Sequence, residues 1–424
     1  MAGKSSGMVS PGIIVSALLS LVGLLVSGGS WLWQPDGREL AGTGFWVSGG
    51  WLFTTLALWI QTRPRDQLWL EPLPWSLKMD QSDQWILTAP FVAKNLNPAL
   101  EVTLAEVHPQ VRLLSEGSLS GIHTHIHLRS RHADAENRAD DYWQAYILSP
   151  QSETYLEVEV TITGSNLTEL QSLRLDLHYV QYGRQQRTPK TTYLIVPLQK
   201  VPLPSQPLWR SVADELKVLA IRTHLLTPAD DLGEVIEQYV KPWAQAGDIV
   251  AISESAVAVV QGQFRHPSQM RLGWVAQRLC YAFPSKTSLS SAYGLQTLID
   301  SSSAWRVVAA FLLGSLGKVI GIPGVFYALA GEQADLIDDV TGSLPPYDQF
   351  IVLGPKDAAA LVKSLGSRTG QAITIVDAND LGGVKLLAAT PEVNPEQVKQ
   401  ALRKNPAGNS AEQTPIVLIR PQAA

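Results

Sequence analysis

Five segments in the middle of the chain alternate apolar and polar residues, and this period of two constrains the fold more than any other feature. They are QWILTAPFVAKN, LEVTLAEVHPQVRLL, TYLEVEVTITG, LRLDLHYVQYG and TTYLIVPLQ. Successive side chains of a β-strand point to opposite faces of a sheet, so the alternation predicts strands with one buried face. Turns rich in Asn, Gly, Pro and Ser separate them. Residues 66–201 are therefore predicted to form an antiparallel, immunoglobulin-like β-sandwich.

One segment of this region, HTHIHL, places His123, His125 and His127 at alternate positions, so a strand would present all three on one face. Imidazole is a common metal ligand, which makes a metal site one interpretation. We prefer a polar face exposed to solvent, because no cluster of carboxylates or cysteines nearby would complete a ligand set. The single cysteine, Cys280, excludes internal disulfides and is interpreted as a buried thiol.

The N-terminal region contains two long windows without charged residues. Gly12–Trp33 is almost wholly apolar, and a second apolar run covers Phe45–Ile60. A short loop joins them, so residues 1–65 are predicted to form a transmembrane helical hairpin. Lys4 and the arginines after the second run predict an integral membrane protein with a two-span anchor, both termini and the soluble domains lying on the cytoplasmic side. The alternative is a cleaved signal peptide with Ile13–Val26 as its apolar core.

Residues 205–424 mix helical and strand patterns, which predicts a mixed α+β domain. Thr227 as N-cap and Pro228 at the first helical position predict a helix that continues to about Val240. The stretch Gly247–Gly262 then places a polar SES turn between two apolar runs. This pattern predicts a strand, a turn and a second strand.

A long apolar segment, Trp305–Leu329, is interrupted by Arg306, Lys318 and Pro323. We interpret it as a buried helical pair, with a third membrane span as the alternative. Its LGSLGK sequence is not a phosphate loop, because position 312 is Leu where GxxxxGK requires Gly. The glycines are expected to allow close contact between the two helices.

Two acidic segments, DLIDDVTG and ITIVDANDLGG, carry Asp338 and Asp377 near predicted strands. Carboxylates are suited to hard divalent ions, which can hold nucleotide phosphates. The alternative is that these residues only cap turns, as Asp and Asn often do. The net charge of −5 and the lack of a long basic run argue against nucleic acid as a partner.

Several blocks of the C-terminal half together resemble the coenzyme F-420-0 gamma-glutamyl ligase family. They are LLTPADDLGEVIEQYV, GDIVAISESAVAVVQG, DLIDDVTGSLPP, ITIVDANDLGGVKLLAA and NPAGNSAEQTPIVLIRP, and they extend from about Ala220 to Pro421. The resemblance implies a mixed α+β domain, often a homodimer, that uses GTP and Mg²⁺ or Mn²⁺ to activate a carboxylate and add glutamate. It implies that Asp338 and Asp377 hold the metal. It also implies a nucleotide site made of Arg222, Thr223, His224, Leu225, Glu254, Ser255, Gly408, Asn409, Glu412 and Gln413.

The chain departs from this family at charged positions. Val259 stands where the family has a lysine, Gln263 stands where it has an arginine, and Ala378 replaces a hydroxyl beside the second metal carboxylate. The basic stretch that the family has after Asn379 is also missing. Losing these cations removes the groups that would neutralise phosphates, so the same reaction on the same substrate is not expected.

Two hypotheses follow for the whole chain. The first is a membrane-anchored, ligase-like enzyme that binds a nucleotide and a divalent metal and acts on a changed small-molecule substrate. The second is a non-catalytic membrane scaffold or interaction protein that retains the ligase-like fold, with the sandwich as its binding module. Resemblance of fold alone does not separate them.

Overall fold

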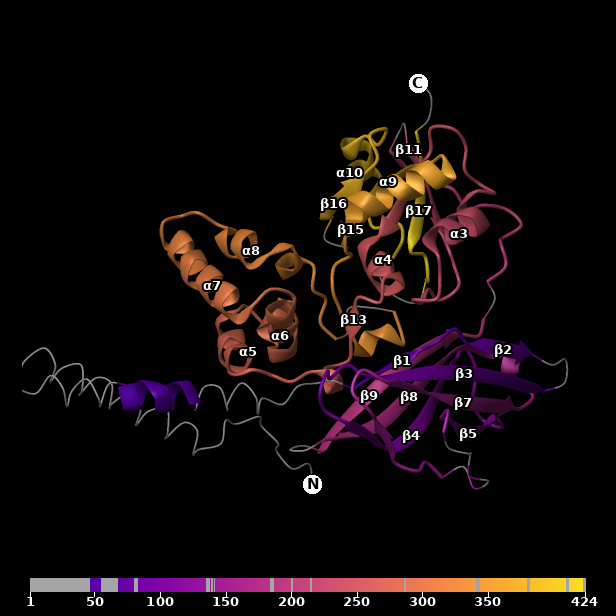
Figure 1. Ribbon diagram of the computed structural model, residues 1–424. Helices are drawn as coiled ribbons and strands as arrows, with labels where there is room; N and C mark the ends of the chain where they lie inside the picture. The colour runs from indigo at the N-terminus through magenta and orange to yellow at the C-terminus, as the bar shows by residue number, and fades with distance from the viewer. Residues whose placement is uncertain are drawn as a thin grey trace, which may run out of the picture.

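The computed structural model describes residues 46–54, 68–79, 83–134, 138, 140, 142–183, 187–199, 201–213, 216–285, 287–340, 344–379, 382–408 and 412–421. Figure 1 shows a β-sandwich, a second domain built on a sheet, and a group of helices that projects to one side. The fold is described in that order, because the candidate site lies in the second domain.

The sandwich consists of two antiparallel sheets of five and four strands. The first has the order β1-β3-β7-β5, with β2 beside β3, and the second has the order β6-β4-β8-β9. The strands are β1 (Leu68–Pro72), β2 (Ser76–Met79), β3 (Gln84–Asn95), β4 (Val102–Ser115), β5 (His123–Arg131), β6 (Tyr146–Leu148), β7 (Glu153–Thr163), β8 (Leu170–Tyr182) and β9 (Arg187–Pro197).

Strand β7 shows why this sequence forms a sandwich. Every second residue from Leu156 to Ile162 is buried, and the residues between them lie nearer the surface. In β3, Leu87 and Phe91 are also buried and belong to the same hydrophobic core. The predicted antiparallel sandwich is confirmed, since alternating apolar residues from both sheets fill one core.

The second domain is built on a six-stranded sheet with the order β10-β11-β17-β12-β15-β16. Only the β12–β15 pair is parallel; the other neighbours are antiparallel. The strands are β10 (Arg210–Ala213), β11 (Leu216–Ile221), β12 (Ile249–Ser253), β15 (Ala372–Ala378), β16 (Val384–Ala389) and β17 (Ile416–Pro421).

Helices cover both faces of this sheet. In β12, Val250 and Ile252 face a core shared with α3 (Leu232–Val235) and α9 (Ala358–Thr369), whereas Ile249 and Ala251 face a core shared with α10 (Pro395–Leu402). A strand buried on both faces has a continuous apolar sequence, as IVAI does here. The mixed α+β content predicted for this domain is confirmed.

The first helix of this domain begins later than predicted. Asp231, not Thr227, is its N-cap, and the Asp231 side chain accepts a hydrogen bond from the Glu234 backbone amide at 2.9 Å. Thr227 instead donates its backbone amide and its hydroxyl to Asp230. After α3 the helix continues as a π-helix, Ile236–Val240.

A helical subdomain, which we define as Trp274–Ala330, lies between two short strands, β13 (Phe264–Arg265) and β14 (Ile351–Val352). It contains α5 (Trp274–Leu279), α6 (Ala292–Ser301), α7 (Ala304–Val319) and α8 (Val325–Ala330). The predicted helical pair is present as α7 and α8. The predicted close contact is also present, because an added Cβ at Gly314 or Gly317 would lie 2.8 Å from the nearest α8 side-chain atom. The prediction that the pair is buried is wrong, since much of α7 is exposed.

The transmembrane hairpin predicted for residues 1–65 requires correction. Of the first span, Gly12–Trp33, no part is described; of the second, only residues 46–54 are, and they are helical. Across the described ranges, no helix combines the length and apolarity needed to cross a membrane. The predicted two-span anchor and integral membrane location are wrong on this finding.

The sandwich packs on the second domain through a buried charged pair. Arg174 of β8 donates to both carboxylate oxygens of Asp176, at 2.6 and 3.0 Å, and to Gln349 of the second domain at 2.7 Å. Its guanidinium also stacks over the rings of Tyr193 and Phe350. Apolar side chains from both domains form one cluster beside this pair, so the two domains share a core.

This interface yields a stability prediction. The substitution Arg174→Met leaves Asp176 buried, with Arg112 at 3.4 Å as its remaining cationic partner. Breaking a buried ion pair from one side costs about 3–5 kcal/mol. We expect the free energy of unfolding, measured by urea denaturation, to fall by that amount. The control is Arg187→Met, whose partner Glu106 is exposed, and it should change stability little. If the two substitutions lowered stability equally, the buried Arg174–Asp176 pair would not stabilise the protein as described.

Candidate functional site

The stretch Gly247–Gly262 forms a strand followed directly by a helix. β12 ends at Ser253, whose dihedral angles of −61° and 135° are extended, and α4 (Glu254–Val260) begins at the next residue. The predicted second strand is therefore wrong. A short apolar run such as AVAVV fits a buried strand or a buried helix equally well, and here the helix buries Val257, Ala258 and Val259.

A cavity of about 390 Å³ opens at this junction. Its volume falls in the range of small-molecule sites. Nine of the twelve site residues predicted from the sequence line it. They are Thr223, His224, Leu225, Glu254, Ser255, Asp338, Asp377, Gly408 and Gln413.

The other three predicted residues are placed differently. Arg222 is exposed and donates to Glu116 of the sandwich at 3.4 Å. Glu412 does not line the cavity; its carboxylate lies beside Gly408, within 3 Å of where a Cβ would be. Asn409 lies outside the described residues.

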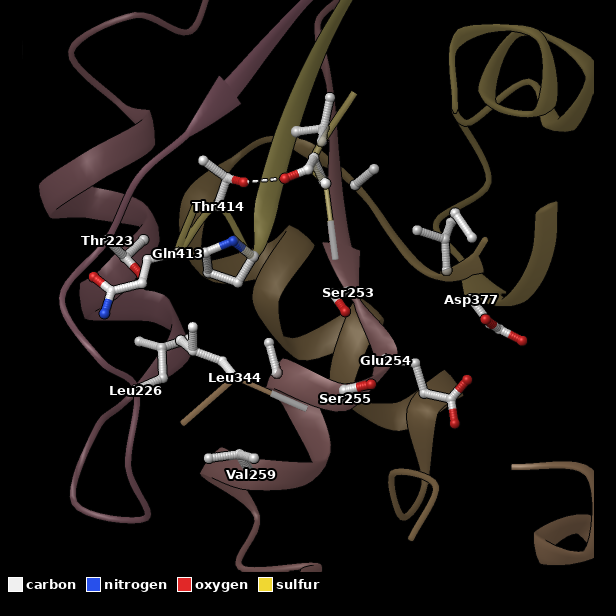
Figure 2. Close-up of a pocket in the computed structure, with 18 of the residues that line it drawn as sticks. Thr223, Leu226, Ser253, Glu254, Ser255, Val259, Leu344, Asp377, Gln413 and Thr414 are labelled. Atoms are coloured by element: carbon white, nitrogen blue, oxygen red, sulfur yellow. Dashed lines mark hydrogen bonds between the residues drawn. The ribbon is translucent and has the colours of Figure 1, made fainter. Parts of the chain in front are cut away.

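Three carboxylates gather at one end of the cavity, and each comes from a different element. Glu254 begins α4 and Asp377 lies in β15. Asp338 is held by two backbone hydrogen bonds to Val352 of β14, and its side chain accepts from the Ser255 hydroxyl at 3.5 Å. Figure 2 shows the Glu254 and Asp377 carboxylates projecting to the same side, opposite Thr223 and Gln413.

This crowding changes the proton affinities of the acids. Burial, followed by the charges of Asp377 and Asp338, raises the pKa of Glu254 to about 8. Burial and the charge of Asp377 raise the pKa of Asp338 to about 6. Burial also raises the pKa of Asp377, although Lys385 opposes the shift. The like charges therefore repel one another, which a bound cation would relieve.

The opposite end of the cavity is apolar. Leu225, Leu226, Val259 and Leu344 line it together with Tyr347, whose hydroxyl donates to the Leu226 carbonyl at 2.9 Å. Tyr347 belongs to the cluster that contains side chains of the sandwich, so this end of the cavity lies next to the domain interface.

His224 lines the cavity but its ring is held by the protein. Nδ1 is 3.0 Å from the Tyr239 hydroxyl, and Nε2 is 2.8 Å from a carboxylate oxygen of Asp230. The Thr223 hydroxyl donates to the His224 carbonyl at 2.8 Å. Both ring nitrogens are thus engaged in fixing the 223–226 segment, which suits a supporting role better than a ligand-binding one.

The residues that line the cavity fit a divalent cation better than a bare anion. Among the described lining residues none is Lys or Arg, so a phosphate would have no basic side chain to neutralise it. Within the described ranges no group of three or more His, Cys, Asp or Glu is arranged to hold a metal. Mg²⁺, however, is usually held by one or two carboxylates, with waters and substrate phosphates as its other ligands. Asp338 and Asp377 would supply the two carboxylates that such a Mg²⁺ site needs.

The sequence missed several lining residues. Asn405 is nearly buried with a positive φ of 42°, and the Thr414 hydroxyl donates to the Ala407 carbonyl. Both lie in or beside the NPAGNSAEQT block, so its turn residues were the available signal. No sequence pattern of this kind could have identified Tyr347, because its place in the cavity depends on the domain interface.

The three histidines of β5 lie apart from this cavity. His123 and His125 are exposed, and the ring centroids of His125 and His127 are 4.4 Å apart. No metal-binding group is found at these residues or elsewhere in the part of the chain that the structure describes.

One family model matches the chain, over residues 69–200, and its description is "F420-0:gamma-glutamyl ligase, N-terminal Ig-like domain". The match supports the family suggested by the sequence, but it falls on the sandwich, which the sequence resemblance had omitted, and not on the C-terminal half. It agrees with the immunoglobulin-like architecture of β1 to β9. A search of curated proteins finds no match.

Several solved structures resemble about a third of the chain at low identity. The GAE domain of GGA2p from Saccharomyces cerevisiae is 10% identical in sequence. The match covers 32% of this chain and 93% of the GAE chain, with a TM-score of 0.20. A protein from Archaeoglobus fulgidus shares 12%, with coverages of 30% and 94% and a TM-score of 0.19. A FixG-related protein from Vibrio parahaemolyticus shares 8%, with coverages of 31% and 97% and a TM-score of 0.17. Scores this low carry no argument about function.

The carboxylate cluster predicts a pH dependence of stability. Glu254 has a pKa of about 8 in the folded protein and an ordinary pKa of 4.5, so between these values the folded state binds more protons than the unfolded state. Stability should therefore fall as pH rises from about 5 to about 8, by about 1.4 kcal/mol per unit of pKa shift at most. Glu254→Gln, which is neutral at every pH, should flatten this decline and be more stable than the wild type at pH 8.

Urea denaturation in chelator at several pH values measures the effect. Glu392→Gln is the matched control, because Glu392 is an exposed carboxylate outside the cavity, and it should retain the wild-type slope. If stability of the Glu254→Gln protein declined with pH as steeply as that of the wild type, the carboxylates would not repel one another as described.

Proposed function

We propose that the C-terminal domain, residues 205–424, is a ligase-like domain that binds a divalent cation through Asp338 and Asp377. Through that cation it binds a phosphorylated small molecule, for which GTP is the first candidate. The observation that carries the proposal is the convergence of carboxylates with raised pKa values at one end of a 390 Å³ cavity. The family match over residues 69–200 supports it from a separate part of the chain.

The cavity residues have distinct roles in this proposal. Asp338 and Asp377 hold Mg²⁺ or Mn²⁺, and Glu254, whose pKa is raised, lies beside them. When bound, the cation supplies neutralisation of phosphate charge, which no described lining side chain can provide. Ser255, Thr223 and Gln413 place polar groups along the wall, and the Leu226–Val259 end takes the apolar part of the ligand.

The substrate differs from that of the family's known ligases. Val259 and Gln263 stand where the resemblance implies basic residues, and Val259 is packed in an apolar cluster with Leu225 and Tyr347. A lysine there would have to displace buried apolar contacts. The site therefore favours a ligand with an apolar portion and fewer anionic groups than the phospholactyl-flavin on which the family's enzymes act.

A second candidate is a non-catalytic binding protein that retains the ligase-like fold. The lack of Lys and Arg among the described lining residues favours it, because catalysis of phosphoryl transfer depends on positive charge around the phosphate. In that case the sandwich and the cavity serve recognition, and replacing Asp338 should leave the protein's cellular role intact.

Isothermal titration calorimetry tests the first candidate. We expect Mn²⁺ to bind the full chain at one site, and GTP to bind only when the metal is present. Asp338→Asn or Asp377→Asn should weaken metal binding about tenfold or more, because even changes outside the first ligand shell cost that much. Metal at a hundred times its dissociation constant should add about 2.7 kcal/mol of stability to the wild type.

Asp339→Asn is the matched control, because Asp339 is adjacent to Asp338 but does not line the cavity. Its carboxylate accepts a hydrogen bond from the Val340 amide at 2.8 Å. This variant should bind metal as the wild type does. Absence of metal binding by the wild type would overturn the proposal, whereas metal binding without GTP binding would favour another phosphorylated or anionic ligand.

A further inference from the structure

The exposed face of α7 is apolar and lies in a basic region of the chain, and these two properties together indicate an interaction surface. The helical subdomain, Trp274–Ala330, projects away from both the sandwich and the six-stranded sheet (Figure 1). One face of α7 carries Trp305, Val308, Leu312, Leu316 and Val319, spaced by three or four residues along the chain. This spacing places all five on one stripe of the helix, which we call the α7 stripe.

The α7 stripe faces solvent, whereas such a stripe normally faces a core. The exposed fractions are 75% for Trp305, 62% for Leu312, 57% for Leu316 and 83% for Val319. The loop that follows adds Ile320 at 63%. Single exposed apolar side chains are common, but a contiguous set of this size marks an interaction surface.

The helix is already anchored on its other side. Val307 and Ala310 are buried in the core of the subdomain, and Gly317 contacts Val325 of α8. The Arg306 guanidinium also donates to the Leu329 carbonyl at 2.8 Å. The stripe is therefore the outward face of a packed helix, and it is held in one orientation for contact with a partner.

The sequence around the stripe is predominantly basic. From Trp274 to Ala330 the sequence contains four basic residues and one acid, Asp300, although the whole chain carries −5. Arg306 and Lys318 lie on α7 itself, and acids resume only at Glu332 and Asp335 after α8. Asp335 is paired with Lys385 on the cavity side of the molecule.

We propose that the α7 stripe docks on an anionic lipid surface, with α7 lying parallel to the surface. Apolar residues would enter the boundary between headgroups and acyl chains, exposed Trp305 would sit at that boundary, and Lys318 would meet anionic headgroups. A second copy of the chain fits less well, because apposing two such faces brings like charges together. This surface is separate from the cavity and does not depend on the ligand bound there.

A local probe tests the proposal in the full chain. Cys280 is the only cysteine, so Cys280→Ser combined with Ser315→Cys places one environment-sensitive fluorophore within the stripe, between Leu312 and Val319. Vesicles of equimolar phosphatidylcholine and phosphatidylserine should shift its emission to the blue, and brominated lipids should quench it. Phosphatidylcholine alone or added salt should weaken both signals.

Two controls accompany the probe. A fluorophore at Ser120, an exposed position in the sandwich, should not respond to vesicles. In the Ser315→Cys protein, Leu312→Glu with Leu316→Glu should weaken the response about tenfold or more, whereas Leu208→Glu, at an even more exposed apolar residue outside the subdomain, should leave it unchanged. Circular dichroism confirms that the variants are folded.

Three results would overturn the proposal. One is no emission shift at position 315 when the protein sediments with vesicles. Another is a blue shift without vesicles that grows with protein concentration, which would show self-association through the stripe. The last is a blue shift without vesicles that is independent of concentration, which would show that another part of the chain covers α7.

Discussion

The candidate site depends on how β12 pairs with its two neighbours. Parallel pairing with β15 places Ser253 opposite Val376, so Glu254 and Asp377, the next residues of each chain segment, lie at the same edge of the sheet. Antiparallel pairing with β17 brings residues 413–415 to that edge, where the Ser253 amide donates to the Pro415 carbonyl at 2.8 Å. β11 ends there too, and the Thr223 amide donates to the Gln413 carbonyl at 3.0 Å. Four segments distant in sequence thus meet at one sheet edge, the usual location of ligand sites in sheets of this kind.

The same arrangement brings the acidic side chains together, and the nearby cations do not match them in number. Lys385 is committed to Asp335 at 2.5 Å, so it only partly offsets the charge of Asp377. The protein keeps this costly cluster although neutral side chains would fold more easily, and buried acids with raised pKa values are typical of functional sites. The apolar end of the same cavity would add hydrophobic contact to the recognition of the proposed ligand.

The sandwich is part of the site's support. Tyr347 lines the cavity and also packs in the cluster that contains Ile195 and Tyr193 of β9, and Arg174 ties the sandwich to Gln349 two residues further along the chain. Movement of the sandwich would therefore displace the apolar end of the cavity. The helical subdomain joins the same region through β13 and β14, and β14 holds Asp338 in place. The proposed lipid surface and the cavity are thus connected by one short strand pair.

The sequence by itself determined the sandwich, since alternation along β3 and β7 leaves only one way to bury the apolar side chains. Through blocks that resemble a known family, it also identified nine of the residues that line the cavity. It did not determine that AVAVV is a helix or where the helix after Thr227 begins, because short segments satisfy more than one local pattern. It predicted a transmembrane hairpin from apolar length, which the described helices do not support. The tertiary structure alone decided that Tyr347 lines the cavity, that Arg222 turns away to the sandwich, and that α7 exposes its apolar stripe. These outcomes depend on contacts between segments far apart in the chain, and local sequence carries no record of such contacts.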